Sequence, residues 1–407
     1  MGSARHEFVT PGSHALLHVA HISFFNDPRG RSPSELLTAW PTMADVAEAV
    51  SLAGARVSVV QASSQEEHFA RNGVQYHFMP IGESATAPSQ SAAFAELLRE
   101  LAADVFHVQG LDFPRQVLAL SDLVPGTPII LQDHAGRVPR FWRRAAMRRC
   151  ASVISGIAFC ALDQAEPFIK AGLIDAKTSI YEIAESTCRF TPGEQGEARR
   201  MTALEGDPAI LWVGHLDANK DPLTVLQGIS DASHHLRDLR LYCCFGVAPL
   251  LQAVQARIKG DPMLRNRVHL LGQVPHDRIE QLMRAADLFV LGSHREGSGY
   301  SLIEALACGL PPVVTDIPSF RMLTGGGRVG RLWPCENARA LSEAVQSIWV
   351  GSRSELRSSV RTHFENELSF HSLGPKLCAM YENVVGRKCD ALEEARGQGL
   401  DRPIPSS

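Results

Sequence analysis

The chain has 407 residues, of which 45% are hydrophobic and 21% are charged, and its formal net charge at pH 7 is -4. These values are typical of globular proteins, so they argue against a disordered or fibrous chain, and the length predicts two domains. The negative net charge argues against a nucleic-acid partner, because proteins of that class usually carry a basic excess.

The cysteines and the N-terminus predict the compartment. Nine cysteines without regular spacing include the adjacent pair Cys243 and Cys244 in an apolar run, which indicates buried free thiols rather than a disulfide framework. Residues 1–13 lack the basic-then-apolar layout of a signal peptide. No apolar run reaches the roughly 18 residues that a membrane-spanning helix needs. We therefore expect a cytoplasmic protein.

The first half of the chain alternates short β-branched runs with amphipathic stretches. Strands are predicted at residues 16–23, 57–61, 105–108, 128–131 and 153–154, and helices at residues 34–53 and 92–102. This alternation is typical of a parallel sheet with helices on both faces. We assign residues 1–14 to a tail and 15–190 to a first Rossmann-like domain.

The same pattern restarts after a polar stretch at residues 191–207, which we interpret as a linker. Strands are predicted at residues 209–213, 239–243, 268–271, 288–291 and 312–314, so residues 208–366 form a second Rossmann-like domain. Two such domains place a ligand cleft where the carboxyl ends of their strands converge.

The C-terminal part is helical in pattern. Its aromatic residues Phe364, Phe370 and Tyr381 have a spacing compatible with one buried face. We expect residues 367–387 to form a helix that crosses back to the first domain. Residues 388–407 are polar and are predicted to be a disordered tail.

The most informative segment is 295–305, with the sequence REGSGYSLIEA. It follows a predicted strand and opens a helix over residues 300–308, so Glu296 lies in the loop and Glu304 about one turn inside the helix. Amide groups at a helix N-terminus bind anions, and carboxylates accept hydrogen bonds from hydroxyl groups. The pair therefore suits a ligand with phosphates and hydroxyls. The alternative is that Glu304 is a solvated helix residue and Glu296 a capping carboxylate.

With residues 304–314, EALACGLPPVV, this segment resembles the signature of the retaining glycosyltransferases of family 4. The resemblance extends to LWVGHLDANK at 211–220, DVFHVQG at 104–110 and IILQDHAG at 129–136, in the order that the family has them. It covers roughly residues 15–385, and it implies the GT-B fold, with two Rossmann-like domains facing each other across a cleft.

The resemblance also implies roles for individual residues. Glu304 would bind the ribose of a nucleotide, and Glu296 would contact the donor sugar. Lys220, His215 and the amides of Ser298, Gly299 and Tyr300 would bind the donor diphosphate. His134 would lie beside the sugar, and Val274 would meet the base. Lys220, Glu296 and His134 are the predicted catalytic residues. A lysine near a helix N-terminus stabilises the negative charge that grows on the departing diphosphate. Considered alone, Lys220 and His134 would instead be an exposed lysine and a structural histidine.

Three departures from the family pattern concern the donor and acceptor sides. His215 stands where the family usually has arginine, so a protonated His215 or the nearby Arg295 would supply the second cation. The first loop has Gly30 in place of a glycine pair, and Gly30 is the candidate for the acceptor or phosphate loop. Residues 183–187, IAEST, replace an asparagine-glycine turn, which places the hinge contacts outside the common pattern.

No cofactor or metal is expected. The chain contains no pair of aspartates separated by one residue, the metal-binding motif of the other major glycosyltransferase fold. The arginine-rich segment 137–149, with Phe141 and Trp142 between the arginines, is either a solvated helix face or a patch that contacts the inner face of a membrane.

The sequence thus predicts a retaining, metal-independent glycosyltransferase that moves a sugar from a UDP- or GDP-linked donor to a small metabolite, a glycan or a lipid-linked acceptor. Two alternatives remain open on the same fold. One is a nucleotide-sugar 2-epimerase, which needs additional carboxylates and a histidine for proton transfer. The other is a nucleotide-sugar-binding protein without catalytic activity.

Overall fold

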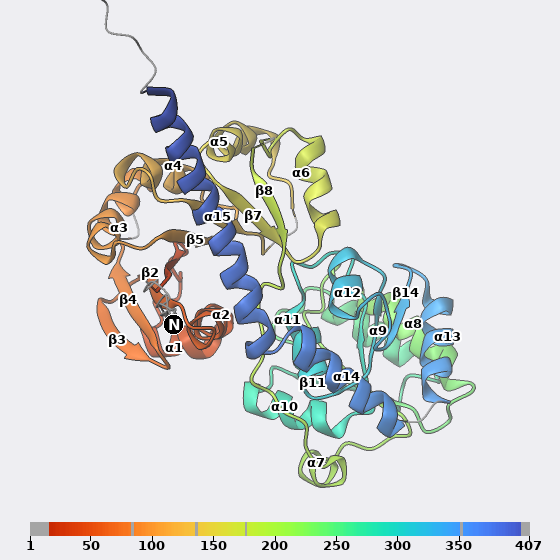
Figure 1. The fold of residues 1–407 in the computed structure, drawn as a ribbon. Coiled ribbons are helices and arrows are strands. Elements are labelled where there is room, and N and C mark those ends of the chain that lie inside the picture. Colours follow the sequence, from red (N-terminus) through yellow and green to blue (C-terminus); the bar gives the residue numbers. More distant parts are fainter. Residues whose placement is uncertain (1–15, 83–84, 135–136, 176, 351–352, 400–407) are drawn as a thin grey trace, which may run out of the picture.

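The computed structural model describes residues 16–82, 85–134, 137–175, 177–350 and 353–399, which form two α/β domains. Each domain is built on one sheet, and helices cover both faces of each sheet (Figure 1). The two doubly wound domains predicted from the sequence are confirmed.

The N-terminal sheet has eight strands in the order β3-β4-β2-β1-β5-β6-β7-β8. All neighbours pair in parallel except β3 and β4, which are antiparallel. The strands are β1 (His18–Ser23), β2 (Arg56–Ser63), β3 (Glu67–Arg71), β4 (Val74–Pro80), β5 (Val105–Gln109), β6 (Ile129–Gln132), β7 (Gly156–Phe159) and β8 (Ser179–Glu182).

The C-terminal sheet has six parallel strands in the order β11-β10-β9-β12-β13-β14. They are β9 (Ala209–Val213), β10 (Arg240–Cys244), β11 (Val268–Gly272), β12 (Leu288–Leu291), β13 (Pro312–Thr315) and β14 (Arg331–Trp333). The central strands β12 and β13 are buried along their whole length, as is expected of parallel strands covered on both faces.

Helices connect the strands in each domain. Those of the N-terminal domain are α1 (Pro33–Ala39), α2 (Thr42–Leu52), α3 (Ala87–Leu101), α4 (Pro114–Leu123), α5 (Phe141–Ala151), the short 3-10 helix η1 (Leu162–Ala165) and α6 (Glu166–Lys170). Those that follow are α7 (Gln195–Thr202), α8 (Pro222–Ser233), α9 (Leu251–Gly260), α10 (His276–Ala285), α11 (Tyr300–Ala307), α12 (Pro318–Leu323), α13 (Ala338–Trp349), α14 (Arg353–Glu367) and α15 (Phe370–Gly399).

Local predictions differ from the structure at several places. The single helix predicted at residues 34–53 is two helices, because Pro41 disfavours a helical conformation at Trp40 and thereby separates α1 from α2. The strand predicted at residues 153–154 is wrong, since these residues lie between α5 and β7. Strands β3, β4, β8 and β14 were not predicted. Of these, β3 and β8 are edge strands without a buried residue, so they lack the apolar run that marks a central strand.

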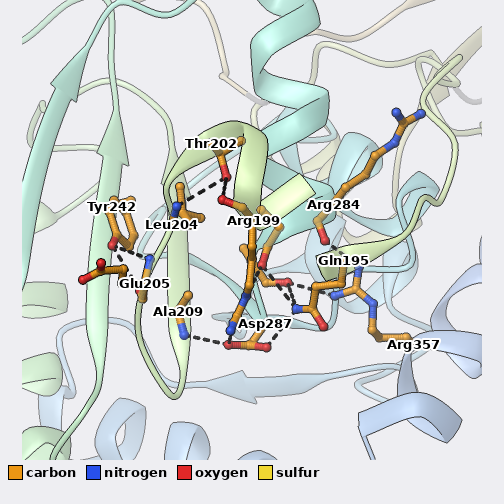
Figure 2. A network of polar contacts seen from close by, with 12 residues as sticks. Gln195, Arg199, Thr202, Leu204, Glu205, Ala209, Tyr242, Arg284, Asp287 and Arg357 are labelled. Atoms are coloured by element: carbon orange, nitrogen blue, oxygen red, sulfur yellow. Dashed lines mark hydrogen bonds and ion pairs between the residues drawn. The ribbon is translucent and has the colours of Figure 1, made fainter. Parts of the chain in front are cut away.

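The linker predicted at residues 191–207 contains a helix that belongs to the C-terminal domain. Helix α7 packs on α10, and its side chains meet the end of α10 and the start of β12 (Figure 2). Arg199 donates to the buried Asp287 carboxylate at 2.6 Å, and Gln195 donates to the other oxygen of that carboxylate at 2.9 Å. Asp287 also accepts from the amide of Ala209, at the start of β9. The segment predicted as a linker thus contains a helix whose polar side chains Gln195 and Arg199 bind Asp287.

Helix α15 joins the C-terminal end of the chain to the N-terminal domain, where it packs on α2 and contacts β5 (Figure 1). Its Tyr381 is fully buried, and the hydroxyl group lies 2.8 Å from Nδ1 of His107 on β5. The helix continues to Gly399, so the disordered tail predicted from residue 388 is wrong for residues 388–399. That stretch is polar but rich in alanine, leucine, glutamate and arginine, which favour a helix.

Candidate active site

The candidate site begins at the loop between β12 and α11. Gly299 caps the N-terminus of α11 with a φ of 87°, a left-handed conformation that other residues adopt at a cost. A Cβ atom at this position would also lie 2.6 Å from the ring of Phe320. The glycine therefore lets the chain turn into α11. The first amide groups of the helix, including that of the predicted diphosphate ligand Tyr300, follow directly after this turn.

A cavity of about 660 Å³ lies between this loop and the segment that follows β9. Five predicted residues line it together, namely His215, Lys220, Glu296, Tyr300 and Glu304. Trp40 and Thr42, at the start of α2, contribute lining from the N-terminal domain. Of the other predicted diphosphate ligands, Ser298 and Gly299 are not part of this described lining.

Lys220 and Glu296 form an ion pair between Nζ and Oε1 inside this cavity. Their side chains are only 14% and 13% exposed. The pair comes from two different segments, and His294 N donates to the carbonyl oxygen of Asn219 at 2.8 Å to hold those segments together. Charges this little exposed are only weakly screened by salt, so an anion that enters the cavity meets a strongly interacting ammonium group.

Glu304 is 3% exposed and pairs with Nε2 of His276, the first residue of α10. Burial raises the pKa of Glu304, and the contact with His276 acts in the opposite direction. The hydrogen bond that the His276 ring donates to Glu304 raises the pKa of His276. The His276 ring lies 4.7 Å from that of Phe190 and 6.3 Å from that of Tyr300. Glu304 is thus a carboxylate that a hydroxyl-bearing ligand can bind by replacing His276, rather than a solvated helix residue.

His134 reaches the site from the end of β6 in the N-terminal domain. Its Nδ1 lies 2.7 Å from Oε2 of Glu185, and its Nε2 lies 2.8 Å from the amide oxygen of Gln109. The protonated ring would donate to both oxygen atoms at once. Burial alone would lower the pKa of His134, but the carboxylates of Glu185 and Asp133 outweigh it and the pKa is raised.

Glu185 also binds the C-terminal domain, because its Oε1 accepts from the amide of Ser298 at 2.9 Å and from the hydroxyl group of Ser298 at 2.5 Å. Gln164, in η1, donates to the carbonyl oxygens of Glu296 and Gly297 at 2.8 and 2.9 Å. The contact at Gly297 is so close that a Cβ atom would lie 2.4 Å from the carbonyl oxygen of His134. The two domains therefore meet directly at the 296–298 loop.

Two other predicted residues lie elsewhere. Val274 packs against the hydrophobic core, and among the described residues it is not part of the lining of the Lys220 cavity. Gly30 lies in a turn that begins at Asp27, and its carbonyl oxygen accepts from Ser64 at 3.3 Å. Of the two candidates for a second cation, His215 shares the cavity with Lys220, whereas Arg295 lines a neighbouring cavity. Residues 135 and 136 of the IILQDHAG motif lie outside the described residues.

No local pattern in the sequence predicts roles for His276, Gln164, Gln109 and Glu185. Glu185 was noted only because its segment departs from the family pattern, and that departure was the one available signal. The contacts of His276 with Glu304 and of Gln164 with the 296–298 loop join residues 28 and more than 130 positions apart in the chain. No local spacing in the sequence indicates such contacts.

Within the described residues, no group of three or more histidine, cysteine, aspartate or glutamate side chains is arranged to hold a metal ion. A search of the same residues finds no helix with the length and hydrophobicity needed to span a bilayer.

Comparison with known proteins gives a consistent picture. Residues 194–362 match the family model described as "Glycosyl transferases group 1". The GDP-mannose:cellobiosyl-diphosphopolyprenol alpha-mannosyltransferase of Xanthomonas campestris is 24% identical over 256 residues, which is 60% of this chain and 64% of that protein, a little under two thirds of its length.

Solved structures share the fold over nearly the whole chain. A glycosyltransferase from Rickettsia africae superposes with a TM-score of 0.70 at 13% identity and covers 91% of this chain and 99% of its own. An Anabaena protein in complex with UDP has a TM-score of 0.66 at 15% identity, and the superposition covers 90% of this chain and 100% of the Anabaena chain. The predicted GT-B fold is thereby confirmed.

Proposed function

We propose that this chain is a retaining glycosyltransferase, which transfers a sugar from a nucleoside diphosphate sugar to an acceptor, as the match of residues 194–362 to the group 1 glycosyl transferases supports. The observation that carries the proposal is that Lys220, Glu296 and Glu304 line one cavity together with the first residue of α11. A cation and helix amides suit a diphosphate, and the two carboxylates suit hydroxyl groups on either side of it.

In this proposal each residue meets a different part of the donor. Glu304 exchanges His276 for the ribose hydroxyl groups. Lys220 leaves Glu296 and pairs with the diphosphate. The α11 amides and His215 also donate hydrogen bonds to the diphosphate. Glu296, once released, accepts from the donor sugar. Lys220 and the α11 amides stabilise the charge that develops on the diphosphate when the glycosidic bond breaks, so they act more strongly in the transition state than in the ground state.

We further propose that the acceptor attacks on the face from which the diphosphate departs, and that the diphosphate takes the acceptor proton. The proposal assigns both carboxylates of the described cavity lining to hydroxyl groups, Glu296 to the donor sugar and Glu304 to the ribose, so neither is left to form a covalent intermediate. The anomeric configuration of the product, followed by proton NMR during turnover, tests this step. An inverted product would contradict it.

We propose that the reaction is metal-independent, because a lysine and helix amides are able to neutralise a diphosphate without a divalent cation. Activity should persist after treatment with EDTA. Activity that is lost with EDTA and restored by a divalent cation would contradict the proposal.

The donor can be identified by thermal shift. GDP-mannose, which the Xanthomonas campestris relative uses by its name, and UDP-sugars, suggested by the UDP in the Anabaena structure, are the first candidates. Incubation of the stabilising donor without an acceptor then separates the reaction classes. Slow hydrolysis of the donor supports a transferase, a 2-epimerised donor supports the epimerase, and a donor that binds but never reacts supports a binding protein.

We propose in addition a peripheral membrane contact at the start of α5, on a protein located in the cytoplasm. Phe141 and Trp142 are 76% and 59% exposed, and their rings lie 5.0 Å apart. Exposed aromatic side chains beside arginines are typical of helices that lie in a membrane interface. The protein should float with anionic liposomes at low salt, and a Phe141→Ser/Trp142→Ser variant should not. Wild-type protein that stays with the soluble fraction would contradict the contact.

A further inference from the structure

We call the cavity lined by Lys220, Glu296 and Glu304 the donor cavity. A second cavity adjoins it on the side of the N-terminal domain. It has a volume of about 620 Å³ and shares Glu296 with the donor cavity. His134 and Gly297 also line it, so it opens at the point where the two domains meet. Under the proposed function, Glu296 lies beside the donor sugar. A molecule in this second cavity is therefore next to the sugar that is transferred.

The lining of this cavity is strongly basic. Four arginines contribute to it, namely Arg137 and Arg140 from the segment leading into α5, Arg143 within α5, and Arg295 from the loop before α11. Three carboxylates also line it, but Glu296 pairs with Lys220, and Asp112 lies 3.8 Å from Arg143. Asp133, the third, is buried.

Three of the guanidinium groups remain available to a ligand. Among the described residues, no carboxylate forms an ion pair with Arg137, Arg140 or Arg295 at 4.0 Å or less. All three side chains are exposed. Val138, between the first two, packs against the N-terminal core and anchors their segment. Within the part of the chain that the structure describes, these three positive charges thus have no carboxylate partner.

The other arginines of the same segment are used differently. Arg144 donates to the carbonyl oxygen of Pro139 at 3.2 Å, and Arg148 donates to that of Gly172 at 3.2 Å. Neither Arg144 nor Arg148 is among the described residues that line the cavity. The arginine-rich segment is therefore not a uniform solvated face, because its N-terminal part points to a cavity and its later part binds backbone oxygens.

We propose that this cavity binds a phosphate or diphosphate group on the acceptor, and that the acceptor is therefore a phosphorylated molecule. Guanidinium groups bind phosphate oxygens through paired hydrogen bonds, which makes arginine suited to such a group. The inference rests on the proposed function, since it concerns the second substrate of the same reaction. It assigns Arg137, Arg140 and Arg295 to acceptor binding and leaves Lys220 to the donor.

The rim of the cavity indicates what the phosphate can be attached to. Trp142 lines the cavity, and the guanidinium group of Arg140 lies 5.3 Å from the centre of its ring. Phe141 is next to it and is more exposed. A phosphate held by the arginines would place an attached apolar chain against these rings, whereas a free sugar phosphate would leave them uncovered.

Isothermal titration with inorganic pyrophosphate tests the cavity directly. Pyrophosphate can bind at both the donor and the acceptor cavity, so the full-length protein is compared in three forms. In Lys220→Ala the donor cavity loses its cation, and pyrophosphate binding should persist. In Lys220→Ala combined with Arg137→Gln and Arg140→Gln, the binding should weaken about tenfold or more, as expected when charge-assisted hydrogen bonds are lost.

The matched control is Lys220→Ala combined with Arg149→Gln, which removes an exposed arginine of α5 that is not part of the described cavity lining. It should bind pyrophosphate as Lys220→Ala does. Equal binding in all three forms would overturn the inference. Liposome binding that falls with Arg137→Gln and Arg140→Gln while pyrophosphate binding does not would also overturn it, and would assign these arginines to the membrane surface.

A parallel titration with geranyl diphosphate separates the two sources of the phosphate. Binding tighter than that of pyrophosphate, and reduced to the pyrophosphate value by Trp142→Ser, supports a lipid-linked acceptor. Equal binding of the two probes supports a soluble phosphorylated acceptor. A different measurement tests the proposed function itself. If that function is wrong, Lys220→Ala should bind nucleotides as tightly as the wild-type protein does, whatever the arginine variants show.

Discussion

Replacement of Glu304 by alanine should abolish most of the stabilisation that the donor nucleotide gives to the protein. Glu304 is 3% exposed and lines the donor cavity, so a ribose hydroxyl group that binds it is removed from water. Hydrogen bonds to a charged group contribute about 1.5–3 kcal/mol, which corresponds to roughly tenfold to a hundredfold in Kd.

The size of the thermal shift follows from this affinity change. A ligand at about 100 times its Kd stabilises the folded protein by about 2.7 kcal/mol, and a hundredfold weaker Kd reduces this to about 0.4 kcal/mol. With roughly 2–4 °C per kcal/mol for a domain of this size, a wild-type shift of about 5–10 °C should fall to about 1–2 °C.

Differential scanning fluorimetry with the nucleotide, supported by titration calorimetry, measures both values. His276→Gln is the matched control, because it removes the partner of Glu304 in the free protein but leaves the carboxylate that would bind the ribose. It should keep most of the shift. A full shift in Glu304→Ala would refute the ribose assignment, and an equal loss in both variants would show that the pair acts only by holding α10 and α11 together.

The remaining predictions concern catalysis and domain closure. Lys220→Ala should lower kcat by roughly 100- to 1000-fold, the usual effect of removing one group that stabilises transition-state charge, and a loss below tenfold in steady-state assays would contradict its role. Gly297→Ala should lower activity while the nucleotide-induced thermal shift persists, because its Cβ would lie 2.4 Å from a backbone oxygen of the other domain. Gly260→Ala is the control, since its Cβ meets no atom within 4 Å, and equal activity of the two variants would contradict the closure argument. The raised pKa of His134 means that its bond to Glu185 contributes stability below the unfolded-state value of about 6.5, and that this contribution is lost as the pH rises through the higher folded-state pKa. Glu185→Gln should therefore move the alkaline limb of the kcat/KM profile to lower pH, and an unshifted limb would show that Glu185 has only a structural role.

Much of the fold was predictable because parallel α/β domains have a strong local signal. The central strands β9, β12 and β13 are continuous apolar runs, and the structure places them within one residue of the predicted bounds. The segment 191–207 was not predictable in the same way. Its polar residues look like a linker until Asp287, some 90 positions away, is seen to bind Gln195 and Arg199 (Figure 2).

The sequence by itself determined the chemistry available to the proposed donor site. The spacing of Glu296 and Glu304 around a glycine-bearing turn, with Lys220 after an earlier strand, is local information that parallel-strand topology brings to one edge of the sheet. Only the tertiary structure decided how those groups are paired and what lies beside them. It joins Lys220 to Glu296 and Glu304 to His276, and it makes Glu185 a bridge between His134 and Ser298. It also brings four arginines into the lining of a cavity that adjoins the one containing Lys220. These contacts join residues from distant segments and from both domains, and such contacts depend on how the domains pack rather than on any local pattern.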